Sequence, residues 1–133
     1  MSRSGYSEGC DYINLYRATV DRAINGKRGQ AFLKELAKAL DDMPDKKLIR
    51  EQLVSEVGEC CTIGAVCKAR GIDVSEVDPH DPEVVGKLVG ISRQMAAEIE
   101  FENDERCEND TTELRWTRMR KWVSDNISKA EGE

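Results

Sequence analysis

The sequence predicts a mainly α-helical protein, a compact single-domain helical bundle of about five to seven helices that contains a helix-turn-helix-like unit. Apolar residues recur at helical spacing through most of the chain, and glycine or proline stands near the expected helix ends. Only 5% of the 133 residues are aromatic, which disfavours a β-sandwich or barrel packed on aromatic pairs. This length suits one domain over residues 1–133, with residues 1–10 and 130–133 expected to be flexible.

Two helices are predicted in the first third of the chain. Residues 11–25 carry an apolar stripe, and Gly26 suits the left-handed position just past a helix end. Residues 30–43 carry a second stripe, and Pro44 stops that helix because the residue before a proline avoids the helical region. The short basic link over residues 26–29 favours an antiparallel helix pair.

The middle of the chain predicts two further helices. Residues 48–57 have apolar residues at helical spacing, and Gly58 follows them. Residues 60–69 are apolar nearly all round and end at Gly71. Since a helix without a polar face is a buried helix, we expect this segment at the centre of the fold.

The last third predicts helices over residues 82–89, 93–101 and 111–129. Asp81 and Ser92 suit the N-cap positions of the first two helices. Asp110 and Glu113 have the spacing of a capping box for the third. A short strand over residues 98–102 is the weaker alternative, because charged and apolar residues alternate there.

Residues 83–99 resemble a helix-turn-helix. That motif needs a small residue in its first helix, a glycine in the turn and an apolar residue after it, and Gly86, Gly90 and Ile91 fill these places. In a DNA-binding regulator, the residues facing the major groove would be Ser92, Arg93, Gln94 and Ala97. Because the acidic residues that follow would be repelled by DNA phosphates, a packing unit without a DNA role is the favoured interpretation.

The net charge of −6 is concentrated in one block. Residues 98–113 hold eight acids and one base, Arg106, so the remainder of the chain sums to about +1. The predicted partner-binding residues are Glu98, Glu100, Glu102, Asp104, Glu105 and Glu108. Such a block can engage a basic nucleic-acid-binding groove on another protein. A solvated face without a partner stays open, and a metal is disfavoured because the acids lack calcium-loop spacing.

The last predicted helix combines basic and aromatic residues. Arg115, Arg118 and Lys121 recur at helical spacing beside Trp116 and Trp122. Basic and aromatic side chains together can bind nucleic acid. The simpler hypothesis is that the basic stripe pairs with the acidic block and leaves the tryptophans in the core.

No motif in the sequence predicts catalysis or a cofactor. A phosphate-binding glycine loop and a glycine-flanked nucleophile are both absent from the sequence, and His80 is its one histidine. The adjacent Cys60 and Cys61 have poor geometry for a tetrahedral zinc ion, so we expect buried free thiols. The sequence therefore predicts no enzyme, no cofactor and no metal. With no leader or membrane-spanning run visible, we expect a cytoplasmic protein.

Three motifs resemble those of a family of small proteins encoded by phages and prophages of Gram-negative bacteria. The motifs are GKRGQAFL over residues 26–33, ENDE over 102–105 and ELRWTRMRKWV over 113–123. The resemblance implies a phage accessory protein in the bacterial host cytosol. Accessory proteins of this size often bind host proteins and inhibit defence systems such as CRISPR. We therefore expect a non-enzymatic protein that binds a host protein or complex through its acidic surface, with a helix-turn-helix DNA-binding regulator as the alternative.

Overall fold

The apolar stripes of the sequence form helices that pack together around one core. A computed structural model describes residues 10–105 and 109–131, and in these ranges it contains six helices, which confirms the predicted fold class. They are α1 (Cys10–Asn25), α2 (Lys27–Asp41), α3 (Thr62–Arg70), α4 (Pro82–Val89), α5 (Arg93–Asp104) and α6 (Thr112–Glu131). None of these helices has the length and apolar character needed to cross a membrane.

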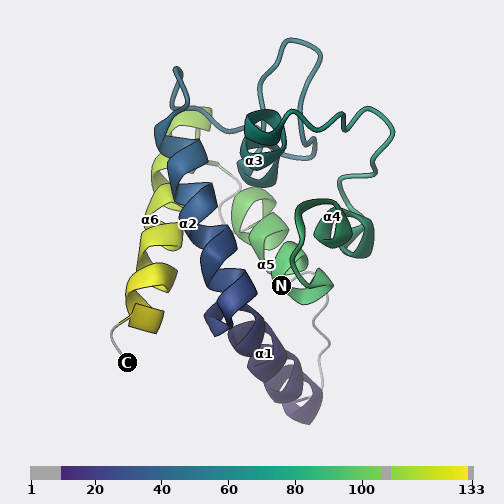
Figure 1. The fold of residues 1–133 in the computed structure, drawn as a ribbon, viewed down its shortest axis with the longest axis vertical. Coiled ribbons are helices and arrows are strands. Elements are labelled where there is room, and N and C mark those ends of the chain that lie inside the picture. The colour runs from purple at the N-terminus through teal and green to yellow at the C-terminus, as the bar shows by residue number, and fades with distance from the viewer. Residues whose placement is uncertain (1–9, 106–108, 132–133) are drawn as a thin grey trace.

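Helices α2 and α6 lie side by side and run in opposite directions (Figure 1). Leu36 and Leu40 of α2 and Met119 and Val123 of α6 are fully buried in the common core. α5 lies on the other side of α2 from α6 in Figure 1, and it contacts α1, α3, α4 and α6. Its central position decides which of its acidic residues reach the surface.

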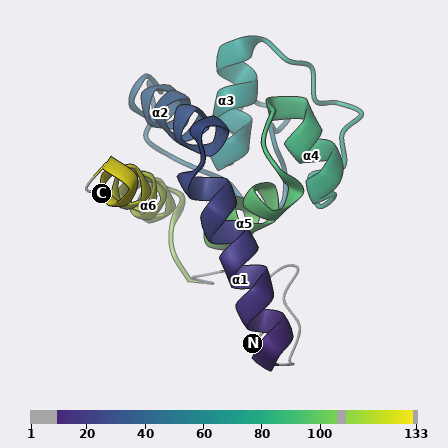
Figure 2. The same ribbon diagram turned by 60° about the horizontal axis from the view of Figure 1, so that its bottom comes forward.

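The connection between α1 and α2 differs from the sequence prediction. Gly26 has φ −74°, so the expected left-handed conformation is wrong, and α2 begins directly after it. A Cβ at Gly29 would lie 2.0 Å from the Ala23 carbonyl oxygen, so the two backbones touch at this bend. One connecting residue is too short to reverse the chain, and α2 continues away from α1 instead of pairing antiparallel with it (Figures 1 and 2).

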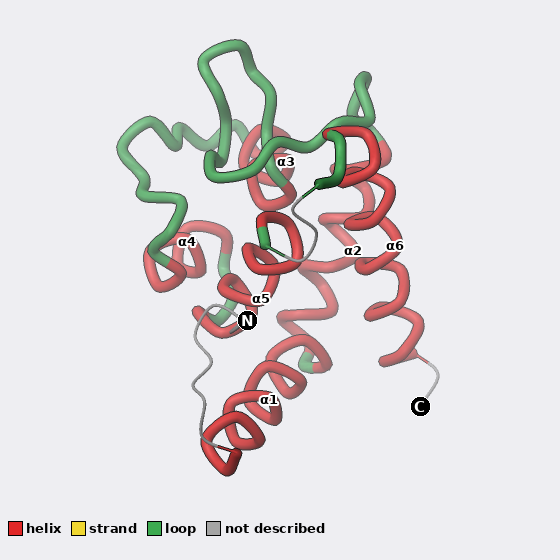
Figure 3. Tube along the Cα trace, turned by 180° about the vertical axis from the view of Figure 1, so that it is seen from behind, coloured by secondary structure: helices red, strands yellow, loops and turns green. Residues whose placement is uncertain are grey.

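The predicted helix over residues 48–57 is wrong, because this segment is a loop. Its backbone folds back on itself through a single antiparallel bridge between Val54 and Cys60. Glu51 has φ 67°, a left-handed conformation that interrupts any helix. Leu48 and Leu53 still point into the core, whereas Val57 is 81% exposed. The loop over residues 42–61 lies at the same end of the molecule as the loop over residues 71–81 (Figure 3).

Helix α3 is buried along most of its length, as predicted. It begins after Cys61 and ends at Gly71, whose φ of 73° suits a glycine C-cap. A Cβ at Gly64 would lie 1.8 Å from the Leu53 carbonyl oxygen. The loop backbone therefore rests directly on α3, which fixes the loop beside the start of the helix.

Helices α4 and α5 are joined by a tight turn at Gly90, which has φ 87°. The predicted caps are confirmed, because Asp81 accepts backbone hydrogen bonds from α4 and Ser92 accepts one from α5. A Cβ at Gly86 would lie 2.7 Å from the Ile91 carbonyl oxygen, so even alanine is too large there. Residues 98–102 are helical, which rules out the strand alternative for this segment.

Arg115 and Arg118 of α6 pair with the acidic block, as predicted, whereas Lys121 of the predicted basic stripe pairs with Asp125 on its own helix. The Asp110 carboxylate accepts from Arg115 Nη2 at 2.6 Å and from Arg118 Nη2 at 2.7 Å. Because Asp110 is engaged in this way, Thr111 and not Asp110 caps α6, accepting from the Leu114 backbone N–H at 3.1 Å. Trp116 packs against the core and donates its indole N–H to the Leu40 carbonyl at 3.2 Å.

Candidate functional site

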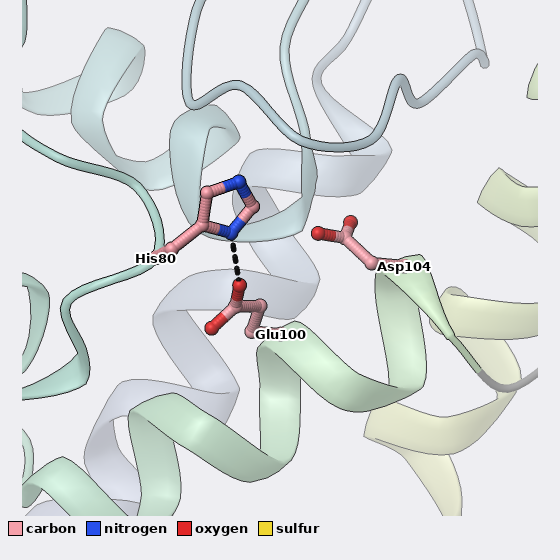
Figure 4. Close-up of side chains that lie close together, drawn as sticks. All are labelled: His80, Glu100 and Asp104. Carbon is pink, nitrogen blue, oxygen red and sulfur yellow. Dashed lines mark hydrogen bonds and ion pairs between the residues drawn. The ribbon is translucent and has the colours of Figure 1, made fainter. Parts of the chain in front are cut away.

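One histidine and two carboxylates meet at the end of α5. Glu100 and Asp104 are four residues apart on this helix and therefore share a face. His80 comes from the loop before α4, and its Nδ1 lies 2.6 Å from Glu100 Oε2. Each residue offers one ligand atom, and these atoms all lie within 4.8 Å of one another (Figure 4).

Neighbouring backbone and side-chain groups hold this cluster in place. Asp104 accepts a hydrogen bond from Asn103 Nδ2 at 2.6 Å and one from the Glu51 backbone N–H at 3.3 Å. The His80 backbone N–H donates to Asp78 Oδ1 at 2.9 Å, which closes a local turn. Asp81 then caps α4, so the histidine is held between a turn and a helix start.

The cluster lines an open pocket with a strong excess of acidic groups. Its walls are made by Arg50, Glu51, His80, Glu100, Asp104, Glu105 and Asn109. Arg50 donates to the Asp104 backbone carbonyl at 3.4 Å rather than to a carboxylate. We call this region the acidic pocket.

Burial and mutual contact shift the pKa of each group in the cluster. Desolvation by burial raises the pKa of Glu100, and the hydrogen bond from His80 only partly opposes it. Desolvation also raises the pKa of Asp104. The hydrogen bond to Glu100 raises the pKa of His80. Each shift favours the protonated state of its own group.

The structure divides the predicted acidic residues into two sets. Glu100, Asp104 and Glu105 line the acidic pocket, whereas Glu98 and Glu102 are buried, with 3% and 6% of their surface exposed. The expectation that Glu98 and Glu102 belong to a binding surface is therefore corrected. These two residues are four apart on the inward face of a central helix, and Glu98 pairs with Arg17 at 3.1 Å. Glu108 lies outside the described residues.

The predicted DNA-contacting residues do not form one accessible surface. Ser92 is the N-cap of α5, and its Oγ accepts a hydrogen bond from the Met95 backbone N–H at 3.1 Å. Arg93 is exposed and Gln94 is half-buried, but Ala97 is only 3% exposed. The expectation for Ala97 is corrected, because α5 lies inside the bundle and eight of its twelve residues are buried.

The pocket residues that sequence patterns did not single out as site residues are Arg50, Glu51, His80 and Asn109. His80 lies 20 positions before Glu100, and no spacing rule connects a loop histidine to that carboxylate. The hint in the sequence is the segment DPHDP over residues 78–82, in which acids and prolines on both sides of the histidine predict a fixed turn. Glu51 lies in the loop over residues 48–57, which sequence periodicity predicted to be a helix, so its place beside Asp104 could not be predicted.

The acidic pocket can hold a cation through His80 and its carboxylates. No protein-family model, curated protein or solved structure matches this chain. Its function is therefore inferred from its own residues.

Proposed function

We propose that this is a non-enzymatic binding protein whose acidic pocket receives a lysine or arginine side chain of a partner protein. One observation carries the proposal. Glu100 and Asp104 are placed together in a half-buried pocket where desolvation raises the pKa of both carboxyl groups. A cationic side chain entering the pocket would compensate for that desolvation.

The energetics favour such a contact over an ordinary surface ion pair. An exposed ion pair is worth little because water screens both charges. A charge-assisted hydrogen bond to a partly desolvated carboxylate contributes about 1.5–3 kcal/mol. Asp104 is already oriented by Asn103 and the Glu51 backbone, so little side-chain freedom is lost on binding.

The resemblance to phage-encoded proteins supplies the biological part of the proposal. The protein would be a phage accessory protein acting in the bacterial cytosol on a host protein or complex. A nucleic-acid-binding groove of a defence complex such as CRISPR has the basic character that the acidic pocket requires. A DNA-binding regulator has less support, because Ala97 is buried and α5 packs inside the bundle.

A peptide titration followed by NMR tests the chemistry of the pocket. We expect an arginine-rich peptide to shift the imidazole resonances of His80, and an alanine-substituted peptide of the same length to leave them unchanged. The effect should disappear in E100Q/D104N and persist in D42N/D125N, which removes two exposed acids, one at the C-cap of α2 and one on α6. If both peptides act alike, or both variants respond alike, the acidic pocket does not recognise cationic side chains.

The ligand geometry also favours a second candidate function, the binding of a divalent metal ion. His80, Glu100 and Asp104 offer one nitrogen and two oxygen ligands, all within 4.8 Å of one another, and the pocket is open to solvent. Three protein ligands with an open position are typical of zinc and related ions. This hypothesis departs from the prediction of no metal, which considered the acidic block without His80.

Calorimetry distinguishes a divalent metal ion from a cationic side chain as the ligand of the acidic pocket. Metal binding predicts saturable heat with Zn²⁺ or Mn²⁺ that is lost in H80A, whereas E83Q, an exposed acid at the start of α4, should bind as the wild type does. Equal metal affinity in H80A and wild type would exclude His80 as a ligand and contradict this three-ligand site.

A further inference from the structure

Among the described residues, three basic side chains without an acidic partner lie together at the bend between α1 and α2. Lys46, Arg50 and Lys68 also lack an acidic partner in these ranges, but they donate to backbone carbonyl groups elsewhere in the fold. Most described arginines have an acidic partner, as in the ion pairs Arg17–Glu98, Arg70–Glu35, Arg115–Asp110, Arg118–Asp110 and Arg120–Asp41. Arg22, Lys27 and Arg28 are exposed, and none of them has an acidic partner among the described residues. Arg22 makes one long hydrogen bond, to Thr19 Oγ1 at 3.4 Å.

These three side chains line the same open pocket at the bend between α1 and α2. Figure 2 shows the path of the backbone at this bend. Its other walls are made by Ala23, Gly26, Gly29, Ile91, Ser92 and Met95. Arg93, which follows Ser92 directly, is also exposed. We call this region the basic pocket. It borders the start of α5, whereas Asp104 of the acidic pocket stands at the end of α5, roughly 17 Å further along the helix.

We propose that the basic pocket binds the phosphate group of a small phosphorylated ligand. Two guanidinium groups and an ammonium group that face one hollow repel each other, and a bound dianion would remove that repulsion. Guanidinium groups match phosphate oxygens with two parallel hydrogen bonds each. This site is independent of the acidic pocket and goes beyond the proposed binding of a partner protein.

The side chains of Arg22, Lys27 and Arg28, and not the N-terminus of α2, supply the affinity for phosphate. The Ala23 and Ile24 carbonyl oxygens at the end of α1 lie against Gly29, so they offset the positive end of the α2 dipole. A small ligand is favoured over a nucleic acid, because the protein carries a net charge of −6 and a long polyanion would be repelled by its acidic regions.

Isothermal titration with inorganic phosphate and with pyrophosphate tests the proposal on the full chain. We expect saturable binding to the wild type and at least about tenfold weaker binding to R22A/R28A, since two charge-assisted contacts are lost. The matched control is K38A/K121A, which also removes two exposed positive charges, one in the last turn of α2 and one on α6. This variant should bind phosphate as the wild type does.

Circular dichroism establishes that each variant is folded, and K27A replaces the double variant if R22A/R28A is not. The proposal is overturned if phosphate does not bind at millimolar concentrations, or if R22A/R28A and K38A/K121A bind equally. It is also overturned if a short oligonucleotide binds while phosphate and pyrophosphate do not. That last outcome would identify the basic pocket as a nucleic-acid contact.

Discussion

Asn103 Oδ1 lies 2.6 Å from Thr62 Oγ1, although the two residues are 41 positions apart in the sequence. The same oxygen accepts from the Thr62 backbone N–H at 3.1 Å. Asn103 Nδ2 donates to the Ile49 carbonyl at 3.0 Å and to Asp104 Oδ1 at 2.6 Å. One buried amide therefore joins the start of α3, the loop over residues 42–61 and the acidic pocket.

Replacing Asn103 with alanine should destabilise the protein by about 3 kcal/mol, because it leaves the buried Thr62 N–H and the Ile49 carbonyl without partners. Urea unfolding followed by circular dichroism measures this loss. T62V removes only the hydroxyl donor and should cost about 1 kcal/mol. Equal losses in the two variants would show that Asn103 does not join these segments.

Breaking the buried ion pairs of Asp110 should be costly. Asp110 and Arg115 have side chains only 4% and 6% exposed, so D110A leaves an arginine buried without its counter-charge. We expect a loss of about 3–5 kcal/mol. The exposed pair Lys121–Asp125 provides the control, and D125A should cost less than about 1 kcal/mol. A small effect of D110A would contradict the stabilising role of these two ion pairs.

The stability of the protein should decrease as pH rises through the pKa of His80. Its pKa is raised above the ordinary value of 6.5 in the folded state, chiefly by Glu100. The folded state therefore holds the proton more tightly, so the stabilisation is complete below pH 6.5 and is lost as pH rises through the folded value. The raised pKa values of Glu100 and Asp104 have the same effect at lower pH. Their contribution to stability is complete below the ordinary values of 4.5 and 3.8, respectively, and is lost as pH rises above them.

NMR titration of the His80 imidazole measures its pKa directly. The midpoint should lie above 6.5 in the wild type and move back toward 6.5 in E100Q, while H80A should lose the decrease in stability above that pH. An unchanged midpoint in E100Q would rule out Glu100 as the main partner of the imidazole.

Gly86 should not tolerate alanine, because the new Cβ would lie 2.7 Å from the Ile91 carbonyl oxygen. Shifting the α4–α5 turn to make room should cost about 1–3 kcal/mol. The control is G71A, where φ is 73° but no atom lies within 4 Å, and it should cost about 1 kcal/mol from backbone strain alone. Thermal unfolding of both variants compares the two causes, and a smaller loss in G86A than in G71A would contradict this account of the turn.

Local patterns predicted the six helices well because their apolar residues recur at helical spacing and several have a capping residue at one end. Asp81, Ser92, Gly71 and Gly90 all end or begin helices where the sequence indicated. The error over residues 48–57 has a physical cause. Its apolar residues have helical spacing, but tertiary contacts decide the backbone there, including the bridge from Val54 to Cys60 and the hydrogen bond from Leu48 N to the Thr112 carbonyl.

The candidate site was predicted only in part. Sequence composition located the acidic block, but it could not tell that Glu100 and Asp104 face outward while Glu98 and Glu102 face inward. That division follows from the place of α5 inside the bundle, which depends on its packing against four other helices. His80 reaches Glu100 only because the loop over residues 71–81 crosses toward the end of α5, and no local pattern records such a crossing.

The most direct test of the acidic pocket is a pull-down of the tagged protein from nuclease-treated bacterial lysate, read by quantitative mass spectrometry. Three forms are compared: wild type, the pocket variant E100Q/D104N/E105Q, and the control D42N/E113Q/D125N, which neutralises three exposed acids elsewhere. The proposed function predicts a stoichiometric partner that is retained by wild type and control and lost by the pocket variant. A partner retained equally by all three would contradict it and place the binding surface elsewhere on the molecule.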